Sequence, residues 1–231
     1  MCDLNLRLYV LGQLPFYKGL PQTNIVEINA MFIEHGYQAG EVIYFEKSPA
    51  SRLFVVADGN VKLMQHTIGG KEVMLDILEQ GEFFGGLTQG TNDCYFETAQ
   101  AHTPVCTLSI ERKDFRQVLV DNPPVALKVM DIIAERLVAA HEMMRLLSVA
   151  SVEQRLAHVL LKLGEKLGEP DEVGLLIQMP LGRGELAELT GTTSETASRV
   201  MSQFQKRGLI KTGRRWVAII DKSGLAAIPE S

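Results

Sequence analysis

Hydrophobic and polar positions follow three successive patterns along the chain. Between about Gly36 and Ile110, short apolar runs rich in β-forming residues alternate with turn residues, which predicts an antiparallel β-roll preceded by short helices. The strand-like runs are "EVIYF", "RLFVVADGNVKLMQ", "KEVMLDIL" and "TPVCTLSI". Asp58-Gly59, inside the second run, predicts a β-hairpin at that point.

The second pattern is a long helix that opens after Pro123-Pro124, since proline is accepted in the first turn of a helix. Apolar residues recur along it at alternating steps of three and four, which forms an a/d seam. The seam consists of Met130, Ile133, Leu137, Ala140, Met144 and Leu147. Other apolar residues lie off the seam, so one side of the helix can cover the roll while the seam meets a second copy. We expect a homodimer; a helix that only packs on the roll is the alternative.

The third pattern begins at about Ser151 with an amphipathic helix, followed by the short apolar strand "GLLIQMP". The next stretch, "LGRGELAELTGTTSETASRVMSQFQKRGLI", has the spacing of a helix-turn-helix. Small Ala187 lets the first helix approach the second, Gly191 makes the turn, and Thr193 is placed as the N-cap of the second helix. After it, "LIKTGRRWVAII" predicts two strands around Thr212-Gly213, the wing of a winged helix.

Charge is distributed unevenly along the chain. The net charge of −5 argues weakly against nucleic-acid binding. However, residues 1–151 carry 12 basic and 18 acidic residues, a net of −6, whereas residues 152–231 carry 11 and 10, a net of +1. The stretch 199–222 holds seven basic residues and one acidic residue. Such a run is either a solvated surface or a surface for nucleic acid.

Composition narrows the class of protein. A hydrophobic share of 46% supports packed cores. No run approaches the roughly 18 apolar residues of a membrane span, and the N-terminus lacks the basic region of a signal peptide. The three cysteines, Cys2, Cys94 and Cys106, form no CxxC motif. We therefore expect a cytoplasmic protein in which Cys94 and Cys106 are packed thiols.

The second helix of the helix-turn-helix carries the candidate base contacts. Glu195, Ser198 and Arg199 stand at i, i+3 and i+4 near its N-terminus, the end that meets base edges in the major groove. An arginine pairs with guanine O6 and N7, and a glutamate accepts from the cytosine amino group. The alternative is an ordinary i, i+4 ion pair on a surface helix. The residues expected at phosphates are Thr192, Thr193, Ser194, Thr196, Lys206, Arg214 and Arg215.

The three patterns together resemble the family of the cyclic-AMP receptor protein and the fumarate–nitrate reduction regulator. The resemblance covers nearly the whole chain through "GEVIYFEK", "LFVVADGNVKLMQ", "KEVMLDILEQGEFFGGL" and "AHTPVCTLSIERKDF". In addition, "SETASRV" is similar to the Glu-x-x-Ser-Arg motif of the fumarate–nitrate branch. The resemblance implies an α+β fold with an antiparallel β-roll sensor domain (1–122), a dimerisation helix (123–150) and a winged helix-turn-helix DNA-binding domain (151–231).

The same resemblance implies a function. It implies a bacterial transcription regulator or activator that binds double-stranded DNA as a homodimer, with RNA polymerase as a further partner. Glu195, Ser198 and Arg199 would then contact a TTGAT-like half-site, repeated as an inverted palindrome.

The sensor domain departs from the family pattern. Cyclic-AMP binders in the family carry Gly-Glu-Leu for the ribose and Arg-Ser for the cyclic phosphate. Here the first site is Gly85, Gly86 and Leu87, and the second falls on Tyr95 and Phe96. A phosphate site needs a cation that pairs with the anion. We therefore expect a degenerate effector pocket that does not bind a cyclic nucleotide.

The residue content also bears on other cofactors and on other classes of function. An iron–sulfur cluster held by four cysteines is excluded because the chain has three. No metal or cofactor is expected. Haem is an alternative, because the chain has the histidines His35, His66, His102 and His141. A redox signal and the absence of any effector are further alternatives. No catalytic motif is present, so we do not expect an enzyme. The alternative function is a β-roll module that controls a partner protein instead of DNA.

Overall fold

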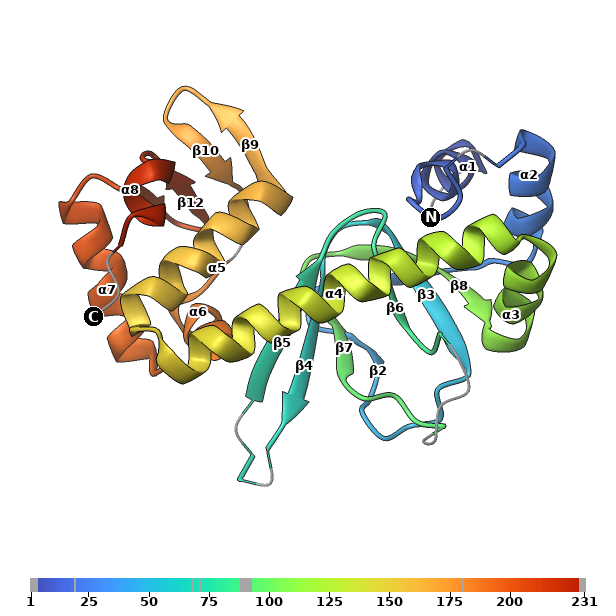
Figure 1. Ribbon diagram of the computed structural model, residues 1–231, viewed down its shortest axis with the longest axis horizontal. Coiled ribbons are helices and arrows are strands. Elements are labelled where there is room, and N and C mark those ends of the chain that lie inside the picture. Colours follow the sequence, from blue (N-terminus) through green and yellow to red (C-terminus); the bar gives the residue numbers. More distant parts are fainter. Residues whose placement is uncertain are drawn as a thin grey trace. The chain divides into compact units, whose positions relative to one another are not determined.

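The computed structural model describes residues 4–18, 20–67, 69–70, 72–87, 93–179 and 181–228 (Figure 1). The chain divides into two compact units, and the main boundary along the sequence lies inside one long helix, between Arg136 and Leu137. Among the described residues, no helix is both long and apolar enough to cross a membrane.

The N-terminal part is built on two four-stranded antiparallel sheets, as the sequence predicts. They are preceded by the helices α1 (Leu4–Gln13) and α2 (Gln22–Ala30). The first sheet, in the order β1-β8-β3-β6, contains β1 (Ile33–Tyr37), β3 (Arg52–Asp58), β6 (Phe83–Gly85) and β8 (Val105–Glu111). The second, in the order β2-β7-β4-β5, contains β2 (Val42–Tyr44), β4 (Val61–His66), β5 (Glu72–Leu78) and β7 (Thr98–Ala101).

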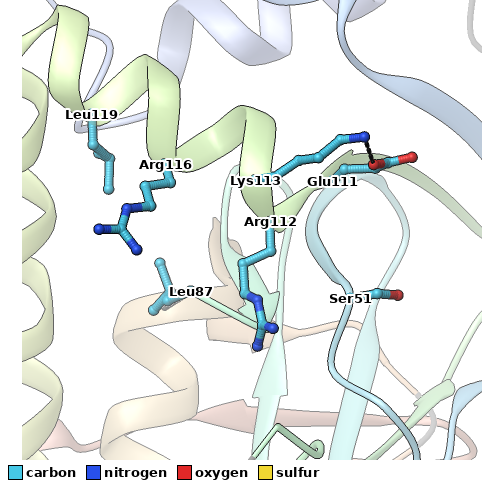
Figure 2. A pocket seen from close by; sticks show the side chains of 7 residues that line it. All are labelled: Ser51, Leu87, Glu111, Arg112, Lys113, Arg116 and Leu119. Atoms are coloured by element: carbon cyan, nitrogen blue, oxygen red, sulfur yellow. Dashed lines mark ion pairs between the residues drawn. The ribbon is translucent and has the colours of Figure 1, made fainter. Parts of the chain in front are cut away.

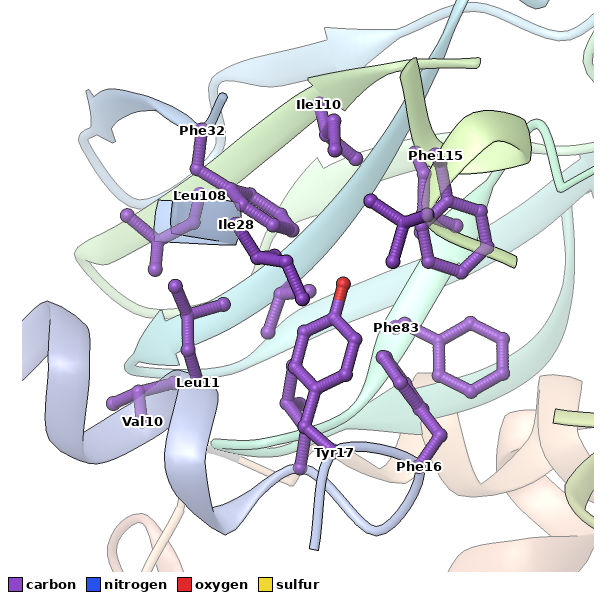
Figure 3. Close-up of a cluster of buried hydrophobic side chains, with 14 of the residues drawn as sticks. Val10, Leu11, Phe16, Tyr17, Ile28, Phe32, Phe83, Leu108, Ile110 and Phe115 are labelled. Atoms are coloured by element: carbon purple, nitrogen blue, oxygen red, sulfur yellow. The ribbon is translucent and has the colours of Figure 1, made fainter. Parts of the chain in front are cut away.

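Strand β3 is buried on both faces, which explains its unbroken apolar run "LFVVA". Leu53 and Val55 pack in a core with α1, α2 and α3 (Arg112–Asp121), while Phe54 and Val56 pack in a second core with residues of the other sheet. Figure 3 shows the first core, where Phe16 makes edge-on ring contacts. The partners of Phe16 are Tyr17, Phe83 and Phe115, with ring centroids at 4.6, 5.3 and 6.1 Å.

The hairpin predicted at Asp58-Gly59 is wrong. Strand β3, which ends at Asp58, pairs with β8 and β6, whereas β4 pairs with β7. The turn therefore carries the chain from one sheet to the other. Gly59 is required there because its φ is 78° and a Cβ atom would clash with the Pro104 carbonyl oxygen.

The C-terminal part follows the predicted order of helices and strands. Helix α4 (Pro123–Val149) opens at the proline pair, and α5 (Val152–Leu167) ends before Gly168. The remaining elements are β9 (Gly168–Asp171), β10 (Gly174–Ile177), α6 (Arg183–Thr190), α7 (Ser194–Lys206), β11 (Ile210–Gly213), β12 (Trp216–Ile219) and α8 (Lys222–Ala226). The four strands form one sheet in the order β11-β12-β10-β9. Helices α6 and α7 form the helix-turn-helix, and β11 and β12 form the wing.

The turn of the wing lies two residues beyond its predicted position. Gly213 pairs with Trp216, so the turn is Arg214-Arg215 and not Thr212-Gly213. Arg215 adopts the left-handed conformation, with φ 68°, that usually favours glycine. Gly213 is needed for a different reason: a Cβ atom there would clash with the Trp216 ring. The glycine thus serves packing, and an arginine occupies the strained turn position.

Candidate nucleic-acid interface

The helix-turn-helix is held together by a small buried core. Ala187 and Ala197 are buried where α6 and α7 pack, as the small residues in the sequence predict. Thr190 at the end of α6 is fully buried, and its hydroxyl donates to the Leu186 carbonyl oxygen at 2.6 Å. The start of α6 is closed by Glu185, whose carboxylate accepts from the Gly182 N–H at 2.8 Å.

The turn and the cap between the two helices are those that the sequence predicts. Gly191 has φ 60° and ψ 43°, the left-handed conformation of a helix C-terminal turn. The Thr192 N–H donates to the Ala187 carbonyl oxygen at 2.9 Å, which closes the turn. Thr193 is the N-cap of α7, because its hydroxyl oxygen accepts from the Thr196 N–H at 3.2 Å.

The candidate base-contacting residues lie on the open side of α7. Glu195 and Arg199 are exposed and Ser198 is half-buried. The opposite side of the helix is buried and consists of Ala197, Val200, Met201 and Phe204. The ion pairs found in the described part of the C-terminal unit do not include one between Glu195 and Arg199. The ordinary i, i+4 pair is thus not formed, and both side chains are available to a ligand.

The candidate phosphate contacts lie at the two ends of α7 and in the turn of the wing. Ser194 is exposed and Thr192 is half-buried at the start of α7. The hydroxyls of Thr193 and Thr196 lie 3.0 Å apart, with Thr193 donating. Lys206 is exposed at the far end of α7, and Arg214 and Arg215 are exposed at the tip of the wing. The structure thus places exposed cations at the end of α7 and in the turn of the wing.

Sequence reasoning missed Arg155, which positions the helix-turn-helix. From α5, its Nε donates to the Thr190 carbonyl oxygen at 2.8 Å and its guanidinium donates to the Ala150 carbonyl oxygen at 2.9 Å. It thus ties the end of α6 to the segment that follows α4. Nothing in the sequence pattern distinguishes this arginine from a solvated one.

The seam on α4 is exposed along its whole length. The exposed fractions are 64% for Met130, 54% for Leu137 and 61% for Met144. Ile133, Ala140 and Leu147 are exposed as well. On another side of the same helix, Val125 and Val129 are buried in the core of the roll. Of the off-seam residues that predict this second side, Ile132 packs against the same core and Leu146 is buried, whereas Val138 is 68% exposed.

The segments predicted to form a degenerate effector pocket contain one packed and one exposed aromatic residue. The Tyr95 ring stacks on Tyr44 with 3.7 Å between centroids, and the Arg52 N–H donates to its hydroxyl at 3.2 Å. Gly86 has no room for a side chain, because a Cβ atom would stand 3.0 Å from the Ala50 carbonyl oxygen. Gly85 has φ 90°, and Phe96 is 72% exposed.

Cysteine and histidine environments differ partly from expectation. Cys106 is disulfide-bonded, so the expectation of a packed thiol is wrong for it, and Cys94 is a free, exposed thiol. Sequence spacing could not reveal this, since disulfide formation depends on which residues the fold brings together. Cys2 lies outside the described residues. Within the described ranges, no three His, Cys, Asp or Glu side chains form a metal-ligand group.

The histidines proposed for haem are in varied surroundings. The His35 Nε2 lies 3.0 Å from the Ser109 hydroxyl, and burial lowers the pKa of the ring. His66 and His141 are exposed, and His102 is half-buried.

Comparison with known proteins identifies the family. Residues 154–228 match the Crp-like helix-turn-helix domain, and residues 34–122 match the cyclic nucleotide-binding domain. The chain is 31% identical over 210 residues to "Probable transcriptional regulator flp" of Lacticaseibacillus casei, covering 90% of this chain and 92% of that protein. The chain belongs to the CRP/FNR family of transcriptional regulators.

Further members of the CRP/FNR family support the assignment. The chain is 30% identical over 191 residues to the transcriptional activator protein FnrA of Stutzerimonas stutzeri, covering 82% of this chain and 77% of that protein. The solved structure of FixK2 from Bradyrhizobium japonicum shares the fold, with a TM-score of 0.77, 23% identity, and coverage of 87% and 98%. The protein is accordingly a transcriptional regulator with a helix-turn-helix DNA-binding domain and is not an enzyme.

Proposed function

We propose that the protein recognises a TTGAT-like inverted palindrome as a homodimer, with Glu195, Ser198 and Arg199 contacting the bases. The observation that carries the proposal is the open side of α7. Glu195 and Arg199 stand there exposed, with no ion pair between them in the described part of the chain. In a recognition helix, the N-terminal residues meet base edges in the major groove.

Homodimerisation follows from the exposed seam of α4. Large apolar side chains in a continuous row are rare on the surface of a monomer. Packing two seams against each other buries them, and a two-fold dimer matches an inverted repeat in DNA. A regulator of this kind acts at promoters, so RNA polymerase is a proposed partner, and the cytoplasm is the proposed compartment.

The test compares Arg199→Ala with Arg215→Ala in gel-shift titrations on the palindrome and on a random duplex. Arg199→Ala should cost about 1–3 kcal/mol on the palindrome and far less on random DNA, because it removes a base contact. Arg215→Ala should weaken both complexes alike and make the salt dependence shallower, because it removes a phosphate contact. Alanine has a Cβ atom as arginine does, so Arg215→Ala keeps the backbone strain that the parent protein has at this turn position. Equal losses on both duplexes for Arg199→Ala would contradict the assignment.

For the signal, we infer that the thiol–disulfide state of Cys106 controls activity. The disulfide at Cys106 favours a redox signal over haem or the absence of an effector. Forming such a bond releases two protons from two thiols and passes two electrons to an oxidant of the peroxide class. DNA binding by the protein should differ between peroxide and a thiol reductant. Cys106→Ser should abolish the difference and Cys94→Ser should keep it; the reverse result would overturn the inference.

A further inference from the structure

A groove of about 710 Å³ lies beside helix α3 in the N-terminal unit (Figure 2). Its lining residues are Ser51, Leu87, Glu111, Arg112, Lys113, Arg116 and Leu119. Arg112, Arg116 and Leu119 stand at i, i+4 and i+7 and share one face of α3, whereas Phe115 and Val118 of the same helix are buried in the core. The volume lies within the range of roughly 300–1,000 Å³ that is typical of small-molecule sites.

The groove carries more positive than negative charge. Lys113 and Glu111 neutralise each other through an ion pair of 2.9 Å at the rim. The Arg112 side chain is only 16% exposed, and it donates to the exposed Asp93 at 3.1 Å. Arg116 is exposed, and none of the ion pairs found in the described part of the N-terminal unit involves it. A guanidinium has five N–H donors, so the described residues leave most donors of the two arginines without a partner.

The groove adjoins the Gly85-Gly86 segment, which is predicted to belong to the degenerate effector pocket. Leu87 directly follows Gly85-Gly86, and the Arg112 backbone N–H donates to the Ser51 carbonyl oxygen at 2.9 Å. In Figure 2 both guanidinium groups extend from α3 toward the side where Leu87 lies. Tyr95 and Phe96 carry no charge, whereas α3 contributes Arg112 and Arg116 to this groove.

We propose that this groove binds a small organic oxyanion. Arg112 and Arg116 would hold its phosphate or carboxylate oxygens, since guanidinium groups pair with either in a two-point geometry. Leu87 and Leu119 would contact its carbon skeleton. The inference rests on the proposed function, because it names the ligand class of the sensor unit of a regulator.

Calorimetric titration of the full chain in chloride buffer at fixed ionic strength tests the site. Phenyl phosphate and glutarate serve as probes, and they distinguish a phosphate from a carboxylate ligand. At least one should bind saturably, and Arg116→Gln should weaken it about tenfold or more, because a charge-assisted pair is lost. Lys18→Gln removes an exposed cation outside the groove and should leave binding unchanged.

A second variant is expected to raise the affinity for the probe, an effect that a folding defect cannot produce. Glu111→Gln removes the carboxylate from the lining and should tighten binding. Absence of saturable binding by both probes, or equal weakening by Lys18→Gln and Arg116→Gln, would overturn the proposal. A gel shift with the same preparations distinguishes this proposal from the proposed function. Binding to the palindrome without oxyanion binding would contradict only the proposal about the groove. Oxyanion binding without binding to the palindrome would contradict only the proposed function.

Discussion

Gly191 stands at the turn of the helix-turn-helix, where both its backbone conformation and a neighbouring side chain disfavour a Cβ atom. Its φ is 60°, and a Cβ atom would stand 3.0 Å from the Leu147 Cδ2 atom. Gly208, after α7, has φ 72° but no heavy atom within 4 Å of such a Cβ. Comparing substitutions at the two glycines therefore separates the effect of backbone strain from the effect of crowding.

We predict that Gly191→Ala lowers the free energy of unfolding more than Gly208→Ala does. Both variants pay about 1–2 kcal/mol for the left-handed conformation, and only the first also crowds Leu147. The single tryptophan of the chain, Trp216 in the wing, reports unfolding of this unit by fluorescence in urea. Equal losses would mean that Leu147 moves aside without cost.

Glu97 provides a prediction about pH. It is largely buried and accepts a hydrogen bond from the Tyr44 hydroxyl at 2.7 Å, and burial raises the pKa of its carboxyl. The folded state therefore holds the proton more tightly than the unfolded state. The resulting stability is fully present below about pH 4 and is lost as the pH rises through the folded pKa.

Replacing Glu97 with glutamine keeps an acceptor for Tyr44 and removes the buried charge. Glu97→Gln should melt a few degrees higher than the parent protein at neutral pH, with the gap closing toward pH 4. Melting temperatures measured across this pH range check the prediction. Glu27→Gln, at an exposed position, controls for the change in net charge. A gap that is constant with pH would show that ionisation of Glu97 is not its cause.

At the scale of elements, local signals predicted helices well and strands less well. The periods of α4, α5 and α7 and the cap at Thr193 are written in neighbouring residues. Strands β1, β6 and β7 were missed because distant partners hold them in place; β7, "TAQA", has little β-propensity and lies between β2 and β4. Strand β9, "GEPD", was missed for another reason: its residues are depleted in strands, although its partner β10 is close in sequence. The turn signal at Asp58-Gly59 likewise could not tell which sheet the next strand joins.

The candidate site divides in the same way. The turn at Gly191 and the cap at Thr193 depend on neighbours in sequence, and both were predicted. The stacking of Tyr95 on Tyr44 and the clamp by Arg155 join residues far apart in sequence, and no local pattern announces them. The row of apolar side chains on α4 was predictable because heptad spacing depends on residues close together in the sequence.

That row yields the prediction for α4. Leu137→Glu combined with Met144→Glu should convert the dimer to a monomer, because charges would be buried between two seams without partners. Sedimentation velocity measures the change. Val120→Glu, at a residue of α3 that is 63% exposed, adds the same kind of charge away from the seam and should leave the dimer intact. A double variant that remains dimeric would place the interface elsewhere.

At the scale of the whole molecule, α4 is the element that both compact units share. The boundary between them falls inside this helix, so a signal in the roll and the DNA-binding unit are linked through one continuous backbone (Figure 1). The family match to a cyclic nucleotide-binding domain describes the fold of the sensor. We expect Gly86, Tyr95 and Phe96 to prevent this domain from binding a cyclic nucleotide.

Cyclic AMP should therefore leave the molecule unchanged. A ligand that binds only the native state must stabilise it by mass action, by about 2.7 kcal/mol at one hundred times its dissociation constant. With the Tyr95 ring packed against Tyr44, we predict no shift in melting temperature and no change in gel-shift affinity at millimolar cyclic AMP. Restoring the family carboxylate with Gly86→Glu should destabilise the protein instead of creating a site, because its Cβ would press on the Ala50 carbonyl oxygen at 3.0 Å. A clear rise in melting temperature for the parent protein with cyclic AMP would refute this interpretation of Gly86, Tyr95 and Phe96.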